Sequence, residues 1–596
     1  MLTYRAPLDE YRFVLHELFD YDSTVAALPG FEDGTSDIAD AVIEECAKFC
    51  ENELLPLNQS GDEEGCTFEN GEVKTPKGFK EAYAAFAGAG WPGLAAATEY
   101  GGQGLPKTLQ VVLDELVCST NLSFGIYPGL SHGAYNAIEL HGTDEQKALY
   151  LPMIAAGTWS GTMCLTEPQC GTDLGLIRTK AEPQDDGSYA LTGTKIFISA
   201  GEHDLTENII HLALARLPDA PPGIKGISLF IVPKFLPNGA SGPGPRNAVA
   251  CGAIEHKMGI KASSTCVINF DGATGFLIGE KHKGMRCMFT MMNAARLAVG
   301  IQGLGLAETA YQSAVSYARD RLQGRSLHGV KHADKPADPI IVHPDVRRTL
   351  MTMRACNEAA RALAIWLAME LDTSEKHPDP EKRQEADDLV ALLTPVVKAY
   401  FTDHGFDTTN AAVQIHGGHG YIREHGVEQL VRDARIAQIY EGTNGIQALD
   451  LVGRKLPQHA GRLLRRFFHP VSKFIEDNME DSELGEFVMP LAKAFARLQQ
   501  ATAFVAQSGM KDPEEAGAAA TDYLRFFALV ALAFMWARMA KEALARKEAG
   551  ANGAFYDAKL STARFFMTRV LPETSSLNAA IMAGAQPVME MHEDWF

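Results

Sequence analysis

The chain has 596 residues and a formal net charge of -21 at pH 7, with 46% hydrophobic and 22% charged residues. At roughly 100–200 residues per domain this length allows three or four domains, and the composition is that of a globular protein. The negative charge disfavours general binding to nucleic acid or to anionic membranes.

Residues 1–160 are predicted to form an N-terminal helical domain. Val42, Cys46 and Phe49 recur at helical spacing, and the glycines of "AAATEYGGQGLPKT" indicate a loop. The opening residues lack the apolar core of a secretory signal, so we expect no targeting segment. The ten cysteines have no metal-like spacing, which predicts reduced thiols in a cytoplasmic protein.

Residues 161–279 have a different character. "KIFIS", "IIHLALARL" and "GISLFIVP" are short runs rich in Ile, Val and Phe, and turn residues bound them. This pattern predicts a middle β domain of several strands, which we expect to be barrel-like.

Helical patterns return after Met285 and predict a C-terminal helical bundle over residues 280–455. The polar stretches 328–342 and 373–385 are predicted to be surface loops. A further helical domain is predicted over residues 456–596. Its run "FFALVALAFMWA" has 12 residues, fewer than the roughly 20 that span a membrane, so we expect a buried helix and no membrane contact. The predicted fold class is multidomain α+β.

No GxGxxG follows a predicted strand into a helix, which disfavours a nicotinamide enzyme. The stretch "MCLTEPQCGTD", from Met163, places small residues in a turn, where backbone N–H groups can approach a flat polar ligand closely. Alone, it is equally compatible with an ordinary turn. Four further stretches accompany it: "GGQG" at 101–104, "KIFIS" at 195–199, "QIHGGHGY" at 414–421 and "RDARIAQIYEGT" at 432–443.

Together and in this order, the five stretches resemble the acyl-CoA dehydrogenase family over about residues 35–455. The resemblance implies FAD bound between the β domain and the C-terminal helices, and oxidation of an acyl-CoA thioester to its 2,3-enoyl form. The FAD contacts that it implies are Leu165, Thr166, Phe197, Ser199, Arg321, Gln414, Gly417, Gly418 and Thr443. An arginine suits the FAD pyrophosphate because its planar fork donates two hydrogen bonds.

The resemblance also implies a catalytic base, Glu441, which removes the α-proton of the substrate while hydride leaves the β-carbon. A carboxylate beside an apolar acyl chain has a raised pKa, which improves it as a base. The alternative for Glu441 is a helix N-cap or an acid in the first turn of a helix. The substrate contacts implied are Thr172, Asn293, Arg296 and Tyr440. For Asn293 and Arg296 the alternative is the polar face of a surface helix.

Histidines cluster near "HGGHG", at His404, His416, His419 and His425, and raise the alternative of a metal site. Their irregular spacing, with glycines between them, predicts no metal.

The length and the opening segment "YRAPLDEYRFVLHELFDYD" resemble an extended branch of the family that takes part in dimethylsulfoniopropionate breakdown. They imply a short-chain acyl-CoA substrate, with 3-(methylthio)propanoyl-CoA as the first candidate. One alternative is a general fatty acyl-CoA dehydrogenase. Another, from a different class, is a flavin-retaining binding protein without dehydrogenase turnover. The family pattern implies an electron-transfer flavoprotein as the electron acceptor, and the extended length implies a homodimer.

Overall fold

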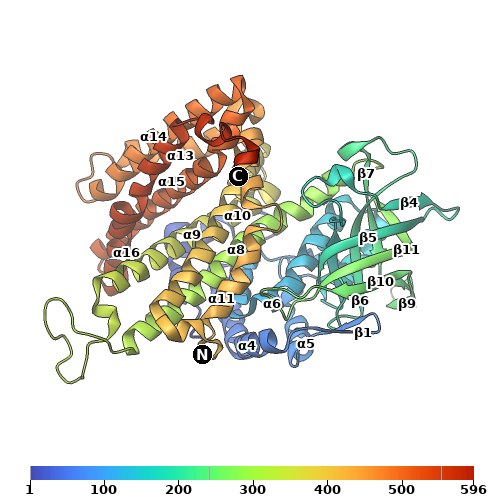
Figure 1. Cartoon of the computed structure of the whole chain (residues 1–596), viewed down its shortest axis with the longest axis horizontal. Coiled ribbons are helices and arrows are strands. Elements are labelled where there is room, and N and C mark those ends of the chain that lie inside the picture. Colours follow the sequence, from blue (N-terminus) through green and yellow to red (C-terminus); the bar gives the residue numbers. More distant parts are fainter. Residues whose placement is uncertain (1, 240–241, 552) are drawn as a thin grey trace. The chain divides into compact units, whose positions relative to one another are not determined.

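The computed structural model describes residues 2–239, 242–551 and 553–596. The chain folds as two compact units, whose elements are labelled in Figure 1. The barrel unit comprises Lys48–Pro106 and Leu116–Ala298, and the helical unit comprises Met1–Ala47, Lys107–Glu115 and Val299–Phe596. The first 160 residues are therefore shared between the two units.

The main strands of the barrel unit are β3 (Trp159–Cys164), β4 (Lys180–Pro183), β5 (Tyr189–Ser199), β6 (Asn208–Arg216), β7 (Ile227–Pro233), β10 (Val249–Ile254) and β11 (Thr265–Ile278). Strand β11 pairs with β5, β5 with β4, β4 with β6, β6 with β7, and β7 again with β11. This closed ring confirms the predicted barrel-like middle domain. Strand β3 lies parallel to β6, and β10 lies antiparallel to β11.

Strand β6 is apolar at almost every position because both of its faces are buried. Ile210, Leu212 and Leu214 pack in one core cluster with side chains of the adjacent helices α6 (Lys107–His141) and α7 (Asp144–Ala155). Ala213 and Ala215, which alternate with them, belong to a second cluster formed by the barrel strands. Because successive side chains of a strand point to opposite faces, a strand buried on both faces must be apolar throughout.

A short hairpin interrupts the helices of the N-terminal segment. Strands β1 (Thr67–Glu69) and β2 (Glu72–Lys74) pair antiparallel on either side of Asn70 and Gly71, which have φ of +54° and +84°. Helical spacing did not anticipate this hairpin. The sequence feature that indicates it is the Asn-Gly pair, which is strongly preferred in two-residue turns with positive φ.

The helical unit is built from α8 (Gly284–Asp320), α9 (Pro344–Lys376), α10 (Pro380–His416), α11 (Val427–Ala434) and α12 (Asn444–Asp450), followed by α13 (Arg462–Asn478), α14 (Gly485–Lys511), α15 (Pro513–Glu548), α16 (Gly553–Phe565) and α17 (Thr574–Met582). The first part of α8, up to Ala298, belongs to the barrel unit. Helices α9 and α10 leave only residues 377–379 between them. The loop predicted over residues 373–385 is therefore too long, because most of these polar residues lie on the solvated ends of α9 and α10.

Within the described residues, α15 is the one helix that is long and apolar enough to cross a membrane, yet 78% of its most apolar window is buried inside the protein. The Phe527 ring lies 4.8 Å from the ring of Phe467, and Phe534 also packs against Phe467, at 6.3 Å. These contacts confirm the predicted buried helix.

Buried ion pairs attach the C-terminal extension to the rest of the helical unit. Lys559 of α16 is fully buried and donates to Glu358 of α9 at 2.9 Å and to Glu10. Next to them, Arg361 donates to Glu115 at 2.6 Å. Removing one partner of such a pair leaves an uncompensated buried charge, so the extension and α9 depend on each other.

Candidate functional site

The turn at residues 165–166, here the 165–166 turn, follows strand β3. Leu165 is buried, whereas Thr166 is partly exposed. The Thr166 carbonyl accepts a hydrogen bond from the Ile196 N–H of β5 at 2.9 Å. The turn with Leu165 and Thr166 is therefore hydrogen-bonded to β5, the strand that carries the other predicted flavin contacts, Phe197 and Ser199.

The end of β5 presents Phe197 and Ser199. The Phe197 side chain is 60% exposed, and its φ of +58° lies in the left-handed region. A bulky residue there is strained by about 1–3 kcal/mol, and such strain concentrates at ligand sites. Ser199 is half-buried and pairs in register with Thr265 of β11. This strand end therefore offers an aromatic face and a hydroxyl group to a ligand.

A buried ion pair that the sequence reasoning did not select supports the 165–166 turn. Lys195 is fully buried and donates to Glu167 Oε1 at 2.8 Å and to the Leu165 carbonyl at 3.1 Å. Glu167 also accepts from the Thr179 hydroxyl and the Arg178 N–H, both at 2.6 Å. Burial alone would raise the pKa of Glu167, but the Lys195 ammonium and these hydrogen bonds outweigh it and hold the pKa at about 2. The carboxylate is therefore charged at neutral pH.

The turn at residues 440–443, here the 440–443 turn, carries the predicted base. Glu441 is half-buried and has a φ of +58°, and Gly442 follows with +83°. The φ of Gly442 favours glycine, and a Cβ there would lie 2.7 Å from Gln447 Nε2, so another residue would also displace the Gln447 amide. Helix α12 begins after Thr443, whose Oγ1 accepts from the Ile446 N–H at 3.3 Å. The N-cap is thus Thr443, so the alternative of Glu441 as a helix cap is wrong.

Three polar side chains hold this turn. Lys398 of α10 is fully buried and donates to the Gly442 carbonyl and to Asn444 Oδ1, both at 2.8 Å. Gln447 Nε2 donates to the Glu441 carbonyl at 3.1 Å. None of the three was predicted. Lys398 lies 44 residues from Gly442 in the sequence, so its contact is visible only in the fold, whereas Asn444 and Gln447 lie close to the turn and were not selected.

Tyr440, a predicted substrate contact, is half-buried, and its hydroxyl donates to Gln302 of α8. Its side chain is therefore oriented by the long helix that begins the helical bundle.

The predicted phosphate and adenosine contacts of the helical unit are exposed. Gln414 lies at the end of α10, and Gly417 and Gly418 follow it with open space where a Cβ would be. Arg321 is exposed directly after α8. Exposed backbone N–H groups and a guanidinium are chemically suited to phosphate.

The remaining predicted substrate contacts lie in the barrel unit. Thr172 and Asn293 are exposed. Arg296 is only 8% exposed, and its Nη1 donates to Asn293 Oδ1 at 3.3 Å. The alternative of a solvated helix face therefore fails for Arg296, whereas the exposure of Asn293 is compatible with both interpretations.

The clustered histidines have aromatic and polar neighbours. His404 Nε2 lies 2.7 Å from Asn357 Oδ1, and His416 stacks on Tyr317 with ring centroids 4.3 Å apart. His419 and His425 stack on each other at 4.7 Å. Within the part of the chain that the structure describes, no three His, Cys, Asp or Glu side chains are grouped to hold a metal ion.

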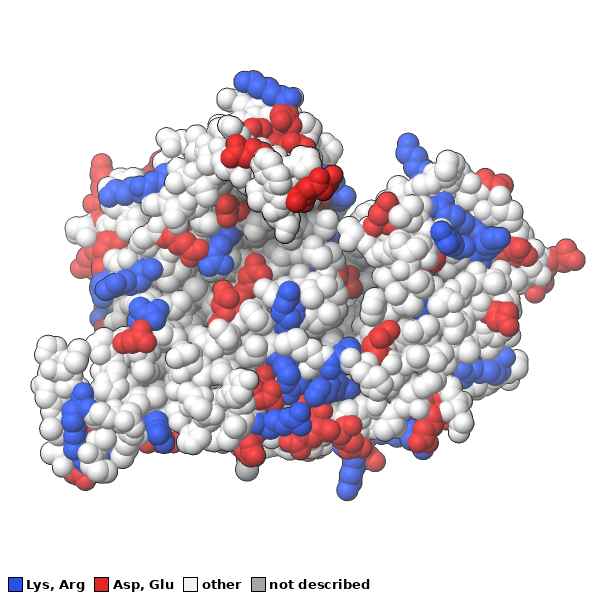
Figure 2. Space-filling model, in the orientation of Figure 1, with Lys and Arg blue, Asp and Glu red and all other residues white. Residues whose placement is uncertain are grey.

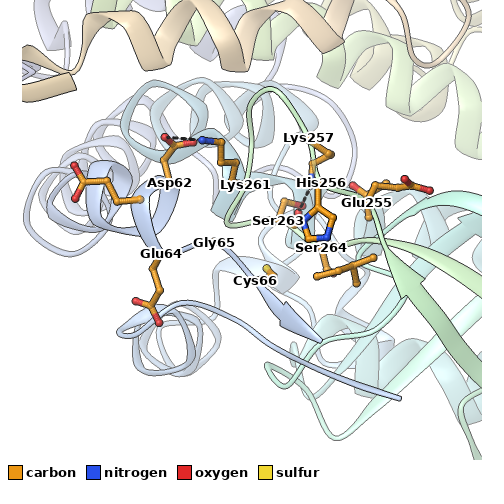
Figure 3. Close-up of a pocket in the computed structure, with 13 residues that line it drawn as sticks. Asp62, Glu64, Gly65, Cys66, Glu255, His256, Lys257, Lys261, Ser263 and Ser264 are labelled. Atoms are coloured by element: carbon orange, nitrogen blue, oxygen red, sulfur yellow. Dashed lines mark hydrogen bonds and ion pairs between the residues drawn. The ribbon is translucent and has the colours of Figure 1, made fainter. Parts of the chain in front are cut away.

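A pocket of about 260 Å³ lies in the barrel unit between the end of α4 (Leu55–Glu64) and the segment that joins β10 to β11 (Figure 3). Both of its lysines have a partner: Lys261 Nζ lies 3.9 Å from Asp62 Oδ2, and Lys257 donates to the Ser263 carbonyl at 2.7 Å. Burial raises the pKa of the Cys66 thiol to about 11, so it is protonated and not nucleophilic at neutral pH. None of the predicted site residues lines this pocket.

On the face shown in Figure 2, acidic and basic side chains are interspersed. The described residues of that face therefore form no continuous basic surface of the kind that binds a nucleic acid backbone.

Family models match almost the whole chain. They are the N-terminal domain of acyl-CoA dehydrogenase over residues 36–158, the middle domain over 162–273, the C-terminal domain over 282–456, and an acetyl-CoA dehydrogenase C-terminal-like domain over 467–592. The last match covers most of the extension.

Relatives and solved structures agree with these matches. The chain is 44% identical to a 3-methylmercaptopropionyl-CoA dehydrogenase of Ruegeria pomeroyi, over 97% of this chain and 98% of that protein. It is 33% identical to a broad-specificity linear acyl-CoA dehydrogenase of Mycobacterium tuberculosis, over the full length of both. The structure of an acyl-CoA dehydrogenase from Bacillus anthracis complexed with FAD has the same fold, with a TM-score of 0.75, 23% identity, and coverage of 95% of this chain and 91% of that one.

The fold, the motifs and the full-length matches all lead to one assignment. The chain belongs to the acyl-CoA dehydrogenase family of FAD-dependent oxidoreductases.

Proposed function

We propose that this protein oxidises 3-(methylthio)propanoyl-CoA to its 2,3-enoyl-CoA. The observation that carries the proposal is the 44% identity to the Ruegeria pomeroyi enzyme over nearly the whole of both chains, extension included. A methylthio group in the acyl chain leaves the α- and β-carbons available for the same loss of a proton and a hydride.

The groups in the barrel unit fit a flavin. Phe197 offers an exposed aromatic face, Thr166 and Ser199 offer hydroxyl groups, and Leu165 lies buried beside Thr166. In the helical unit, Arg321 would bind the pyrophosphate, and Gln414, Gly417, Gly418 and Thr443 would contact the rest of the cofactor. When bound, FAD supplies the acceptor for the hydride that leaves the β-carbon.

Glu441 is the proposed base. Its carboxylate takes the α-proton as the α and β C–H bonds break and the new double bond forms, so that the two electrons of the β C–H bond leave with the hydride. The backbone N–H of Glu441 is proposed to donate to the thioester carbonyl, which makes the α-proton more acidic. The bonds from Lys398 and Gln447 hold this backbone in place.

Thr172, Asn293, Arg296 and Tyr440 are proposed to bind the CoA thioester. The pairing of Arg296 with Asn293 orients the guanidinium before substrate arrives, and an oriented guanidinium loses less freedom when it binds a phosphate.

A second candidate is a general dehydrogenase of straight-chain acyl-CoAs. It is favoured by the 33% identity to the broad-specificity linear acyl-CoA dehydrogenase and by an equal identity to a butyryl-CoA dehydrogenase of Syntrophomonas wolfei over 99% of that protein. A flavin-retaining protein without turnover is disfavoured by the presence of Glu441 in a preformed turn.

Two partners belong to the same proposal. An electron-transfer flavoprotein would reoxidise the flavin, because the sequence lacks a dinucleotide fingerprint. The active form would be a homodimer, since the exposed residues Gln414, Gly417 and Gly418 suit a cofactor shared with a second subunit. Light scattering that gave a monomer or a tetramer mass would contradict the dimer.

The substrate is tested by comparing kcat/KM for 3-(methylthio)propanoyl-CoA, butanoyl-CoA and palmitoyl-CoA with a dye electron acceptor. We expect kcat/KM for the methylthio substrate and for butanoyl-CoA to differ by no more than about 10–200-fold, because one methylene in an apolar pocket is worth about 1–3 kcal/mol. We expect palmitoyl-CoA to be poor. Preference for palmitoyl-CoA would favour the general fatty acyl-CoA dehydrogenase.

A further inference from the structure

We infer that Lys195 and Glu167 are positioning residues, which fix the direction of the Thr166 backbone N–H toward the flavin. The inference rests on the proposed function, because it takes the 165–166 turn to contact the cofactor.

The geometry of one peptide bond carries the argument. Lys195 Nζ donates to the Leu165 carbonyl at 3.1 Å, which fixes the direction of that C=O. In a trans peptide the C=O and the following N–H point in opposite directions. The N–H of Thr166 therefore points away from Lys195.

The next peptide is fixed independently. Its carbonyl, that of Thr166, accepts from the Ile196 N–H at 2.9 Å, and its N–H, that of Glu167, donates to the Cys170 carbonyl at 3.0 Å. The Thr166 N–H takes part in neither bond. It is left as a preoriented donor at the partly exposed Thr166.

Glu167 makes this arrangement possible. A lysine with no exposed surface would otherwise lose its proton or its position, because burial of an unpaired ammonium is costly. Oε1 of the carboxylate accepts from Lys195 at 2.8 Å and from the Thr179 hydroxyl, and Oε2 accepts from the Arg178 N–H. Glu167 thus keeps Lys195 charged and in reach of the Leu165 carbonyl.

Two variants separate positioning from simple stabilisation. Lys195→Met removes both the donor to Leu165 and the partner of Glu167. Lys195→Met/Glu167→Gln removes the donor too, but leaves no unpaired carboxylate, and the single acceptor oxygen of the glutamine can keep either the bonds from Thr179 or the bond from Arg178. The control is Lys234→Met, which disrupts another ion pair of the barrel unit, between the partly buried Lys234 and the buried Glu202, and touches no predicted flavin residue.

Three quantities are measured on purified protein: the unfolding temperature without added FAD, the FAD dissociation constant, and the visible spectrum and reduction potential of the bound flavin. We expect Lys195→Met to lower the unfolding temperature and to weaken FAD binding about tenfold or more. The double variant should recover part of the lost unfolding temperature, but neither the FAD affinity nor the wild-type spectrum and potential. Lys234→Met should lower the unfolding temperature and leave the flavin properties unchanged.

Several results would overturn the inference. Full recovery of the FAD affinity and the reduction potential in the double variant would show that Lys195 only neutralises the charge of Glu167 and does not position the turn. Wild-type flavin properties in Lys195→Met would show that the donor is not needed, and a double variant that does not fold would assign the pair to the fold alone. A wild-type protein that binds no FAD would instead refute the proposed function, which distinguishes the two failures.

Discussion

The 165–166 turn and the 440–443 turn are held in a similar way but in different surroundings. In each, a fully buried lysine from a neighbouring element donates to a main-chain carbonyl: Lys195 to Leu165, and Lys398 to Gly442. Lys195 also bonds to a buried carboxylate, Glu167, whereas Lys398 bonds to the amide oxygen of Asn444.

Because the partners differ, loss of the lysine should have a different energetic cost in each turn. Loss of Lys195 leaves a buried carboxylate unpaired, which costs about 3–5 kcal/mol in comparable cases. Loss of Lys398 leaves two neutral oxygens with only their longer bonds, from Gln447 to the Gly442 carbonyl at 3.4 Å and from Thr402 to Asn444 Oδ1 at 3.3 Å, so it should cost no more than about 1–3 kcal/mol. The first change should therefore act strongly on stability and cofactor binding. The second should act chiefly on the alignment of Glu441.

The largest expected effect is at the base itself. Glu441→Gln should keep its FAD and bind acyl-CoA, but should lower turnover by at least about 10²–10⁴-fold, because a glutamine cannot take the α-proton. Stopped-flow measurement of flavin reduction checks this. Glu548→Gln, which changes an exposed carboxylate at the end of α15, is the control. Near-normal reduction in Glu441→Gln would place the base elsewhere.

Lys398→Met tests the support of the 440–443 turn. We expect kcat to fall by about 10²-fold with little change in KM and unchanged FAD content, since a misplacement of about 1 Å at a catalytic group has effects of this size. Steady-state kinetics against Lys382→Met, an exposed lysine on the same helix, provides the comparison. Equal kcat in the two variants would show that the turn holds without Lys398.

Acid should act on both units through buried neutral histidines. Burial lowers the pKa of His203 and His211 in the barrel unit, and of His404 in the helical unit, to about 3. Their pKa in the unfolded chain is near 6.5, so the unfolded state binds more protons between pH 6.5 and 3, and stability is lost as the pH falls through that window.

Each histidine should contribute about 1.4 kcal/mol per pH unit in that window. Calorimetry of the wild type and of His404→Gln between pH 7 and 5 measures the slope, with the exposed His592→Gln as the control. An unchanged slope in His404→Gln would mean that His404 is protonated in the folded state.

The smallest effect is expected at the helix cap next to the base. Thr443→Ala removes the hydroxyl that accepts from the Ile446 N–H and should cost about 1 kcal/mol of stability. Thr443→Ser should restore it. If serine and alanine behave alike in thermal unfolding, the hydroxyl does not cap α12.

The sequence was informative where a signal is local. Short apolar runs bounded by turn residues predicted the β domain, helical apolar patterns predicted the bundles, and the motifs identified Glu441 as the candidate base. The supporting residues were not predictable in the same way, because Lys195 lies 28 residues from Glu167 and Lys398 lies 44 from Gly442, and such contacts exist only once the strands and helices have assembled. The burial of Arg296 was missed for the same reason.

One measurement tests the central claim most directly: anaerobic titration of the purified wild-type protein with 3-(methylthio)propanoyl-CoA, followed by visible absorption. The account predicts a yellow protein with one FAD per subunit. Its flavin absorption should be bleached by the substrate, with formation of the 2,3-enoyl-CoA, whereas Glu441→Gln stays oxidised over the same time. A colourless protein that does not take up FAD, or a flavin that the substrate leaves oxidised, would contradict it.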